Sequence, residues 1–253
     1  MNEDLLVTLI VPAYNEGEKL YANMEAVIRR WQGVHPFELI VVDDGSRDAT
    51  AAQIRRLEDA HREVRGLVLP RNLGKGAALR AGTAMAQGEV IVYYDADLEI
   101  PVDEVARLTE MLITGKWAAV VGNKKACSRT PARRLLTAVF RLTCALLWPG
   151  LPDSQTGLKV FRRGPLLEAL TDTRLDRYLF ELELVLALSR RTKSWEAMAE
   201  ADVEAGWNRR SSRIGILALG QCALEFWSIL RRFGPRGGPE RWRHVQTDKG
   251  IAA

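Results

Sequence analysis

The sequence predicts an α/β domain with a mostly parallel β-sheet flanked by helices. Short runs of β-branched and other apolar residues alternate with stretches of helical periodicity through the first half of the chain. The apolar runs are continuous, which is typical of strands that helices cover on both faces. Each run ends in a polar cluster, and ligands of open α/β sheets bind beyond the carboxyl ends of the strands. We therefore expect a binding site along that edge of the sheet.

Composition narrows the class of protein without identifying it. The chain has 253 residues, of which 47% are hydrophobic and 27% charged, and these values exclude a disordered, collagen-like or multi-span membrane protein. The net charge of +4 favours an anionic partner such as a nucleotide or a lipid phosphate. The acidic residues Glu3 and Asp4 stand where a secretory leader has basic residues, so we expect a cytoplasmic protein.

The elements follow from the apolar patterns in chain order. Strands are predicted at residues 6–11, 38–42, 65–69, 89–94 and 118–121. The helices between the first four of them are predicted at residues 16–31, 48–62 and 75–86. Residues 152–163 are expected to form a loop that leads into a strand. Further helices are predicted at residues 131–148, 176–191 and 214–230, before a loose tail rich in Gly, Pro and Arg.

The strongest candidate for chemistry is the group Asp95, Ala96 and Asp97, directly after a predicted buried strand. Two carboxylates separated by one residue can share a divalent cation. Hard oxygen ligands suit Mg²⁺ or Mn²⁺, which can also bridge to substrate phosphates. Glu99 offers a third oxygen ligand. A solvated acidic turn is an equally good interpretation of this motif taken alone.

Three more polar clusters follow predicted strands. Asp43 precedes Asp-Gly-Ser, where its carboxylate can accept hydrogen bonds from a base or a ribose, although Asp beside Gly also signals a turn. Tyr14 and Glu16 follow the first strand and can flank a nucleoside. Lys75 lies between two glycines before an Ala-rich helix, where it faces either an anionic ligand or solvent.

Several of these blocks occur together in a fixed order. PAYNE, VVDDGS, RNLGKG and DADLEIP follow one another within the first 101 residues, and DSQTGLKVFR, FELE and NRRSSR come later in the chain. In this order the sequence resembles the family 2 glycosyltransferases of the GT-A fold. Within them it is most similar to the polyprenyl-phosphate hexose synthases, the dolichyl-phosphate mannose and glucose synthases. The resemblance extends over residues 5–213.

The resemblance implies roles for individual residues. The implied nucleotide-sugar site consists of Pro12, Tyr14, Glu16, Asp43, Asp95, Ala96, Asp97 and Lys124, and Lys75 is added from its place before a helix. The implied ligands of Mg²⁺ or Mn²⁺ are Asp95, Asp97 and Glu99. The implied catalytic residues are Asp97, Arg129, Arg133 (or its neighbour Arg134), Arg209 and Arg213.

One position departs from the family pattern. The family usually has Gly-Ser-Arg after the fifth strand, whereas this chain has Gly122, Asn123 and Lys124. Lysine keeps the positive charge but lacks the planar fork with which arginine grips a phosphate. Arg129 is the alternative candidate for this phosphate contact.

The implied reaction is inverting, metal-dependent transfer of a hexose, mannose or glucose, from GDP-mannose or UDP-glucose to a polyprenyl phosphate. A phosphate monoester with a second pKa of about 6 is mostly a dianion at neutral pH, so arginines that position it suffice and no base is needed. Two alternatives stay open. One is a family 2 enzyme with a hydroxyl acceptor, which needs a base such as Asp153, Glu181 or Glu183. The other is a nucleotide-sugar-binding protein without catalysis.

Nucleic acid is not an expected partner, because the basic residues are not interleaved with aromatic residues on a recognisable module. Helices 131–148 and 214–230 are too short or too polar to span a bilayer, yet too apolar for ordinary surface helices. They are expected either to lie in the membrane surface or to pack in the core or a dimer interface. The first case describes an enzyme peripheral to the cytoplasmic face of the membrane, with basic tail residues at anionic headgroups.

The expected organisation follows from the extent of the resemblance. A glycosyltransferase domain is predicted at residues 1–213, with a nucleotide-sugar half at about 1–122 and an acceptor half at about 123–213. An amphipathic helix at 214–232 and a basic, flexible tail at 233–253 complete the predicted chain.

Overall fold

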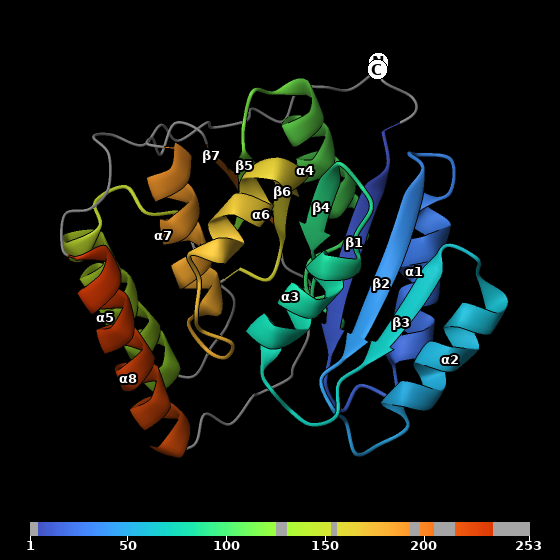
Figure 1. Cartoon of the computed structure of the whole chain (residues 1–253), viewed down its shortest axis with the longest axis horizontal. Helices are drawn as coiled ribbons and strands as arrows, with labels where there is room; N and C mark the ends of the chain where they lie inside the picture. The colour runs from blue at the N-terminus through green and yellow to red at the C-terminus, as the bar shows by residue number, and fades with distance from the viewer. Residues whose placement is uncertain (1–4, 125–130, 153–155, 193–197, 205–215, 235–253) are drawn as a thin grey trace.

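The computed structural model describes residues 5–124, 131–152, 156–192, 198–204 and 216–234. Its centre is a seven-stranded sheet with the strand order β3-β2-β1-β4-β6-β5-β7 (Figure 1). The strands are β1 (Val7–Ala13), β2 (Phe37–Asp43), β3 (Val64–Val68), β4 (Val90–Tyr93), β5 (Ala119–Lys124), β6 (Lys159–Arg162) and β7 (Met198–Val203). Helices cover both faces, so the predicted α/β fold with a mostly parallel sheet is confirmed.

The half of the sheet around β1 is entirely parallel. β1 pairs with β2 on one side and with β4 on the other, and β2 pairs with β3. The connecting helices are α1 (Leu20–Trp31), α2 (Thr50–Ala60) and α3 (Lys75–Met85). Residues 7–11 of β1 have no exposed surface, because helices lie over both faces of this strand.

The other half of the sheet contains elements that the apolar patterns did not predict. β6 runs antiparallel to both β4 and β5, while β7 extends the sheet parallel to β5. Helices α4 (Val102–Thr114) and α6 (Arg163–Thr171) and strand β7 were absent from the prediction. The predicted loop and strand at residues 152–163 correspond to β6 and the chain before it.

The sheet separates two hydrophobic layers. The first layer packs α1, α2 and α4 against one face and includes Trp31 and Leu108. The second layer packs α3, α6, α7 (Phe180–Thr192) and α8 (Ile216–Phe233) against the other face and includes Leu79 and Phe180. These two layers fix the helices relative to the strand ends that carry the candidate site.

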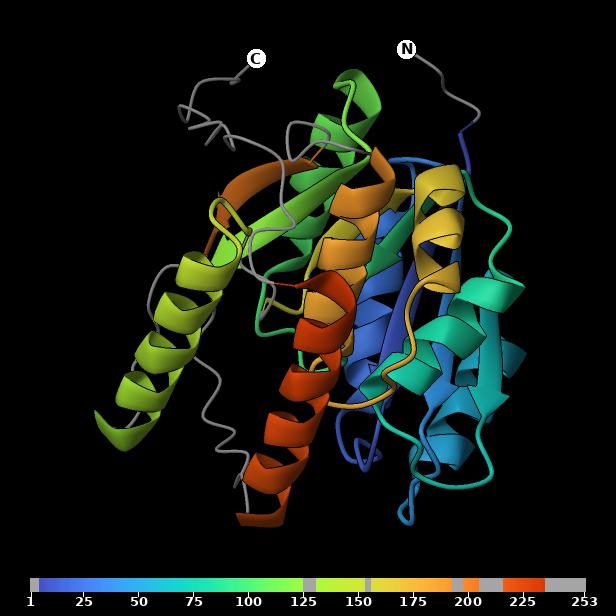
Figure 2. The same cartoon turned by 60° about the vertical axis from the view of Figure 1, so that its left-hand side comes forward.

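Helices α5 (Pro131–Leu147) and α8 lie side by side at one end of the molecule (Figures 1 and 2). The rings of Phe140 and Trp148 pack edge-on against the ring of Phe226 in α8, with centroid separations of 6.2 and 5.9 Å. The Trp148 indole N–H also donates a hydrogen bond to the carbonyl of Gly234 at 2.8 Å. Within the described part of the chain, no helix is both long and apolar enough to cross a membrane.

Candidate active site

The polar clusters converge at the carboxyl edge of the parallel strands. β1, β2 and β4 run in the same direction, so the residues that follow them emerge at one edge of the sheet. The chain continues from β1 to β2 on one side and later returns to β4 on the other. Such a change in strand order opens a crevice in which α/β proteins bind ligands. Pro12, near the end of β1, and Asp43, at the end of β2, lie at this crevice.

The loops after β1 and β2 are fastened to each other. The Asn15 N–H donates to Oγ of Ser46 at 2.8 Å, and Oδ1 of Asn15 accepts from the Arg47 N–H at 3.0 Å. Asn15 has a φ of 54°, a left-handed conformation that asparagine tolerates better than most residues. These contacts explain why α1 begins at Leu20 and not at the predicted Glu16. Tyr14 in this loop is exposed to solvent.

The two aspartates after β2 have different surroundings. Asp43 is buried, and its Oδ1 accepts the Ser46 N–H at 2.8 Å. Its Oδ2 is buried without a hydrogen-bond donor from the described residues, which is costly unless a ligand supplies one. Asp44 instead accepts the N–H groups of Leu73 and Gly74 at 2.7 and 2.9 Å. Asp43 is thus suited to a ligand, whereas Asp44 holds the turn before α3.

The acidic group after β4 lies in a compact turn. The carbonyl of the buried Ala96 accepts a hydrogen bond from Nδ2 of Asn23 at 2.7 Å, and Oδ1 of Asp97 accepts the Glu99 N–H at 3.1 Å. Burial raises the pKa of Asp97, and the negative charges of Asp95 and Glu99 raise it further. The turn therefore holds like charges close enough to repel one another.

Lys75 reaches this acidic turn from the start of α3. Its Nζ lies 2.7 Å from Oδ1 of Asp95 and 3.2 Å from Oε1 of Glu181 in α7. The same oxygen of Glu181 lies 3.3 Å from Nζ of Lys159, which is completely buried in β6. Burial by itself would lower the pKa of Lys75, but the charges of Asp95 and Glu181 outweigh it and raise that pKa. Lys75 thus faces the carboxylates of Asp95 and Glu181, and its predicted contact with an anionic ligand stays a prediction.

The carboxylates of Asp95 and Asp97 fit a divalent cation that a substrate helps to hold. Their repulsion, expressed in the raised pKa of Asp97, is the kind that a bound cation relieves. Within the described residues, no three His, Cys, Asp or Glu side chains form a complete metal cluster. Mg²⁺ is commonly held by one or two carboxylates together with substrate phosphates, so this pair is sufficient. The assignment of Asp95, Asp97 and Glu99 as metal ligands stays a prediction.

Most of the predicted basic residues fall outside the described part of the chain. Arg129, Arg209 and Arg213 lie in residues 125–130 and 205–215. Lys124 ends β5 and Arg133 lies near the start of α5, but the structure describes neither side chain. Their contacts with phosphates therefore stay predictions.

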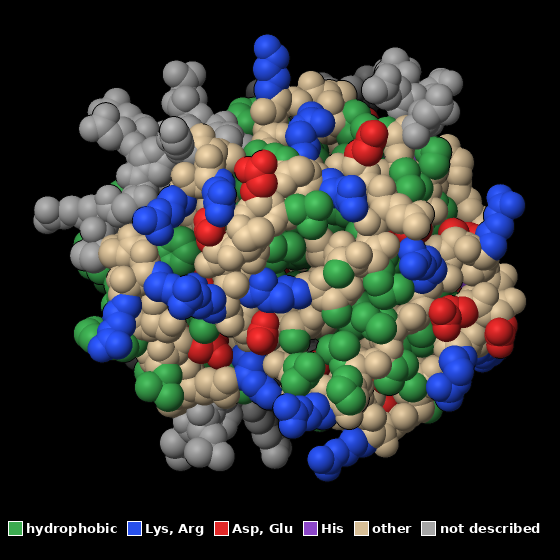
Figure 3. Space-filling model, viewed as in Figure 1, with side chains coloured by type: hydrophobic (Ala, Val, Ile, Leu, Met, Phe, Trp, Pro, Cys, Tyr) green, Lys and Arg blue, Asp and Glu red, His purple; other side chains and the backbone are tan. Residues whose placement is uncertain are grey.

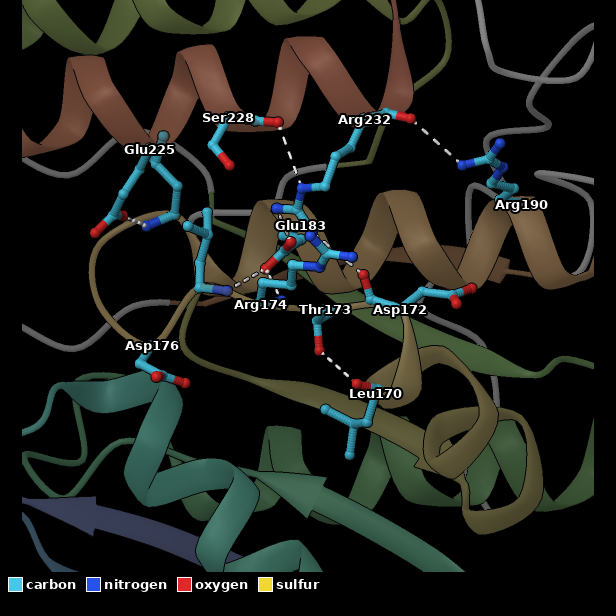
Figure 4. Close-up of polar contacts among 12 residues, drawn as sticks. Leu170, Asp172, Thr173, Arg174, Asp176, Glu183, Arg190, Glu225, Ser228 and Arg232 are labelled. Atoms are coloured by element: carbon cyan, nitrogen blue, oxygen red, sulfur yellow. Dashed lines mark hydrogen bonds and ion pairs between the residues drawn. The ribbon is translucent and has the colours of Figure 1, made fainter.

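Glu183, one of the candidate bases, has a structural role. It is completely buried, and its Oε2 accepts the N–H groups of Arg174 and Leu175 at 3.0 and 2.7 Å (Figure 4). Its Oε1 forms an ion pair with the guanidinium of Arg232 in α8. A carboxylate satisfied in this way is not available to remove a proton from an acceptor.

Glu181 is the site residue whose surroundings the sequence did not reveal. From the sequence it is a candidate base in the FELE block, whereas the structure places it between Lys75 and Lys159. The signal was present in that block, because a carboxylate in a largely apolar, buried helix is rare unless it is paired. Its partners could not be identified, because both lie on other elements far away in the chain.

Comparison with known families decides the identity of the domain. Residues 8–169 match the model of the family described as "Glycosyl transferase family 2". The chain belongs to glycosyltransferase family 2. Asp43, Asp95 and Asp97 of this glycosyltransferase all lie within the matched residues.

Curated relatives of this glycosyltransferase have names that specify lipid-phosphate substrates. It is 33% identical over 246 residues to a dolichyl-phosphate β-glucosyltransferase of Trichomonas vaginalis, covering 89% of this chain and 71% of the relative. It is 38% identical over 170 residues to an undecaprenyl-phosphate 4-deoxy-4-formamido-L-arabinose transferase of Pseudomonas fluorescens. That match covers 62% of this chain and 47% of the relative.

Solved structures share the fold of this glycosyltransferase. Glucosyl-3-phosphoglycerate synthase from Mycobacterium tuberculosis, in complex with Mn²⁺, UDP-glucose and phosphoglyceric acid, has a TM-score of 0.71 at 21% identity. The match covers 91% of this chain and 80% of that one. A mannosyltransferase from Pyrobaculum calidifontis, in complex with GDP-mannose and Mn²⁺, has a TM-score of 0.59 at 23% identity, covering 83% and 59%. The predicted GT-A fold is confirmed.

Proposed function

We propose that this glycosyltransferase transfers a hexose from a nucleotide-diphosphate sugar to a polyprenyl phosphate. The main support for the proposal is the similarity, over 89% of this chain, to a relative whose name specifies dolichyl phosphate. A second relative is named for undecaprenyl phosphate, a different polyprenyl phosphate. What the two names have in common is a phosphate on a polyprenyl chain, while their sugars differ.

The donor half of the proposal rests on the strand-end residues. The buried Oδ2 of Asp43 is suited to accept a hydrogen bond from a base or a ribose hydroxyl. Lys75 places a positive charge beside Asp95, where a diphosphate would lie next to the cation. Glucose is the sugar to test first, because the relative matched over most of the chain is named a β-glucosyltransferase. Mannose from GDP-mannose is the second donor to test.

The chemistry requires little proton transfer from the protein. An oxygen of the acceptor phosphate attacks C1 of the sugar, the bond from C1 to the diphosphate oxygen breaks, and the electron pair leaves with the nucleotide diphosphate. Attack from the face opposite the leaving group inverts the anomeric carbon. Because the acceptor is a dianion near neutral pH, no proton has to be removed from it. The protein has to hold the donor diphosphate and the acceptor phosphate, both negatively charged, close to C1 of the sugar.

Asp95 and Asp97 would hold Mg²⁺ or Mn²⁺, which when bound neutralises charge that develops on the diphosphate. Lys75 contributes a second positive charge from the start of α3. The glutamates weighed as bases for a hydroxyl acceptor have other partners. Glu183 is buried in an ion pair with Arg232, and Glu181 is paired with two lysines. These pairings disfavour the two glutamates as bases for a hydroxyl acceptor, while the third candidate, Asp153, lies outside the described residues.

We further propose that α5 and α8 bind the membrane surface that contains the acceptor. The apolar residues exposed on the two helices are Val139, Leu142, Leu146, Leu224 and Trp227. In α8, Leu224 is 73% exposed whereas its neighbour Glu225 is 8% exposed, so apolar side chains also face outward from a helix whose Ile229 packs into the core. An apolar face turned outward on a pair of helices is suited to insert into the headgroup region of a bilayer.

Basic side chains accompany this apolar face. Lys and Arg side chains gather over α6, α7 and α8 on the face seen in Figure 3. The exposed arginines of these helices and the segments beside them include Arg163, Arg174, Arg190, Arg191 and Arg231. Each basic residue near an anionic membrane surface contributes about 1 kcal/mol of attraction. This distribution supports a peripheral association with anionic lipids.

The acceptor class is tested by comparing a short-chain prenyl phosphate with the matching unphosphorylated prenol. The assay measures transfer of radiolabelled glucose from UDP-glucose in the presence of Mg²⁺ or Mn²⁺, with GDP-mannose as a parallel donor. We expect transfer to the phosphate and none to the alcohol. Equal transfer to both acceptors would exclude the phosphate mechanism and favour a hydroxyl acceptor.

A further inference from the structure

The ammonium group of Lys75 lies against a carboxylate that a divalent cation would use. Nζ of Lys75 lies 2.7 Å from Oδ1 of Asp95, a distance typical of a charge-assisted hydrogen bond. A doubly charged cation on the same carboxylate would be repelled by the ammonium at this distance. Binding of the cation is therefore favoured if Lys75 moves away from Asp95, or if another negative group offsets the charge of Lys75.

Glu181 offers Lys75 a second partner without a large movement. Its Oε1 lies 3.2 Å from Nζ of Lys75, so the ammonium already contacts carboxylates on both sides. A small rotation of the lysine side chain is enough to strengthen one contact and weaken the other. An ammonium that changes partners in this way keeps an ion pair throughout.

The surrounding structure holds Glu181 at this distance. Nζ of the completely buried Lys159 lies 3.3 Å from the same carboxylate oxygen and restrains it from the sheet side. Next to Lys75, Gly76 allows α3 to approach α7, because a Cβ atom there would lie 2.5 Å from the ring of Phe180. The distance between Lys75 and Glu181 is thus set by backbone packing as well as by their charges.

We propose that Glu181 is a positioning residue that draws Lys75 away from Asp95 when a divalent cation binds. The inference rests on the donor half of the proposed function and is independent of the acceptor. In the absence of a cation, Lys75 neutralises Asp95. With a cation at Asp95, Lys75 pairs with Glu181 and directs its remaining N–H bonds toward the donor diphosphate.

The test is Mn²⁺ binding to the full chain with saturating UDP and no acceptor, measured by electron paramagnetic resonance of free Mn²⁺ against the same UDP solution without protein. We expect Glu181→Gln to weaken Mn²⁺ binding by about three- to tenfold, because Lys75 then remains on Asp95. We expect Lys75→Met to tighten it by a similar factor, because the competing charge is gone. In the double variant, the effect of Glu181→Gln should disappear, since no lysine is left to position.

The double variant separates positioning from a general loss of negative charge. If Glu181→Gln weakens Mn²⁺ binding equally with and without Lys75, the effect is ordinary electrostatics and the proposal is wrong. Asp176→Asn is the matched control, since Asp176 lies in the loop beside Gly74 but pairs with Arg80 at 3.1 Å. It should leave Mn²⁺ affinity within about twofold of the wild type.

Other outcomes also decide the proposal. Unchanged Mn²⁺ affinity in Glu181→Gln overturns the proposal. Unchanged Mn²⁺ affinity in Lys75→Met overturns it too, and this second variant still tests the proposal if Glu181→Gln does not fold. A wild-type chain that binds no Mn²⁺ overturns it as well. In that last case, sugar transfer to a prenyl phosphate without metal would show that the proposed reaction still holds while the metal site does not.

Discussion

Asp95 and Asp97 place two negative charges in one short turn, where the ammonium group of Lys75 offsets part of their repulsion. Lys75 neutralises Asp95 at 2.7 Å, while the charges of Asp95 and Glu99, together with burial, raise the pKa of Asp97. The remaining repulsion lies where the proposed cation and donor diphosphate would bind. Repulsion between buried or half-buried charged groups is typical of active sites, where side chains are positioned to bind a ligand even at a cost in stability.

The substitution Asp97→Asn tests the metal assignment at this residue. Removing the charge should lower metal-dependent turnover by on the order of 10²-fold or more, because the cation loses one of its two carboxylates. Thermal stability without metal should stay the same or rise, since a repelling charge is gone. Initial rates across a Mn²⁺ titration, together with thermal unfolding, measure both effects. Wild-type turnover in this variant would refute the assignment.

Gly157 gives a second test that leaves every charge in place. A Cβ atom at Gly157 would lie 1.7 Å from Oδ2 of Asp95, so alanine there must displace the carboxylate. We expect Gly157→Ala to weaken Mn²⁺ binding by about tenfold or more, because metal sites depend on ligand position. Gly164→Ala in α6 is the control, because nothing lies within 4 Å of a Cβ atom there. Equal Mn²⁺ affinity in both variants would show that Asp95 is not a ligand.

Sequence alone identified the acidic residues but not their neighbours. Asp43, Asp95 and Asp97 could be predicted because each follows an apolar run that ends at the same sheet edge. The different roles of Asp43 and Asp44 could not be predicted, because Asp44 is occupied by N–H groups of the turn at residues 73–74, which is distant in sequence. The contacts of Lys75 with Glu181 depend on how α3 and α7 pack, which no local pattern encodes.

At the scale of elements, α8 buries polar side chains beside the apolar Ile229, while Leu224 stays exposed. Glu225 is buried and accepts the Leu179 N–H at 2.9 Å, and Arg232 pairs with the buried Glu183. The polar side chains of α8 thus fasten it to α7 and to the loop before it (Figure 4). This explains why α7 begins at Phe180, later than predicted, and why α8 continues to Phe233.

The ion pair between Arg232 and Glu183 should dominate the stability of this contact. Arg232→Met leaves a completely buried carboxylate without its cation, and breaking such a pair costs about 3–5 kcal/mol. Arg231→Met is the matched control, because Arg231 is exposed and stacks over the ring of Trp227. Urea denaturation of both variants measures the difference in the free energy of unfolding. Equal values would show that the pair does not hold α8 in place.

The features that the sequence did not predict have separate causes. β7 carries Glu200 and Asp202 within six residues, so it lacks the continuous apolar run that revealed the other strands. The antiparallel direction of β6 depends on pairing with β4 and β5, and an apolar run has no direction. α4 follows the acidic turn closely, and its buried Val105, Leu108 and Leu112 recur at helical spacing, so the sequence does contain the signal for this helix.

At the scale of the whole molecule, the acidic strand ends and the exposed apolar helices occupy different places. The acidic residues lie after β2 and β4, while α5 and α8 form one end of the molecule (Figure 1). This separation fits the proposed function, in which a water-soluble donor binds at the strand ends and a lipid-anchored acceptor is presented from the membrane. The small net charge of +4 is the sum of the charges of acidic and basic regions that lie in different places.

Membrane association should depend on the exposed side chains of α5 and α8. We expect the double variant Leu146→Ser and Trp227→Ala to bind anionic vesicles at least about tenfold more weakly, because each buried apolar side chain contributes about 1.5–3 kcal/mol. Val68→Ser is the control, because Val68 is also half-exposed but lies on β3 at the far edge of the sheet. Vesicle co-sedimentation at low and high salt measures the membrane binding of the double variant and of the control.

Two results would contradict the membrane proposal. Binding of the double variant equal to that of the control would show that the helices do not contact lipid. Loss of a dimer in the double variant, seen by light scattering without vesicles, would assign the apolar face to a second copy of the chain.

The most direct test of the central claim is the structure of the reaction product. The wild-type enzyme is incubated with UDP-glucose, whose sugar is α-linked, and a short-chain prenyl phosphate, and the product is analysed by ³¹P and ¹H NMR. The account predicts a phosphodiester that joins C1 of glucose to the prenyl phosphate in the β configuration. A glucoside of an alcohol, or a phosphodiester that keeps the α configuration, would contradict it.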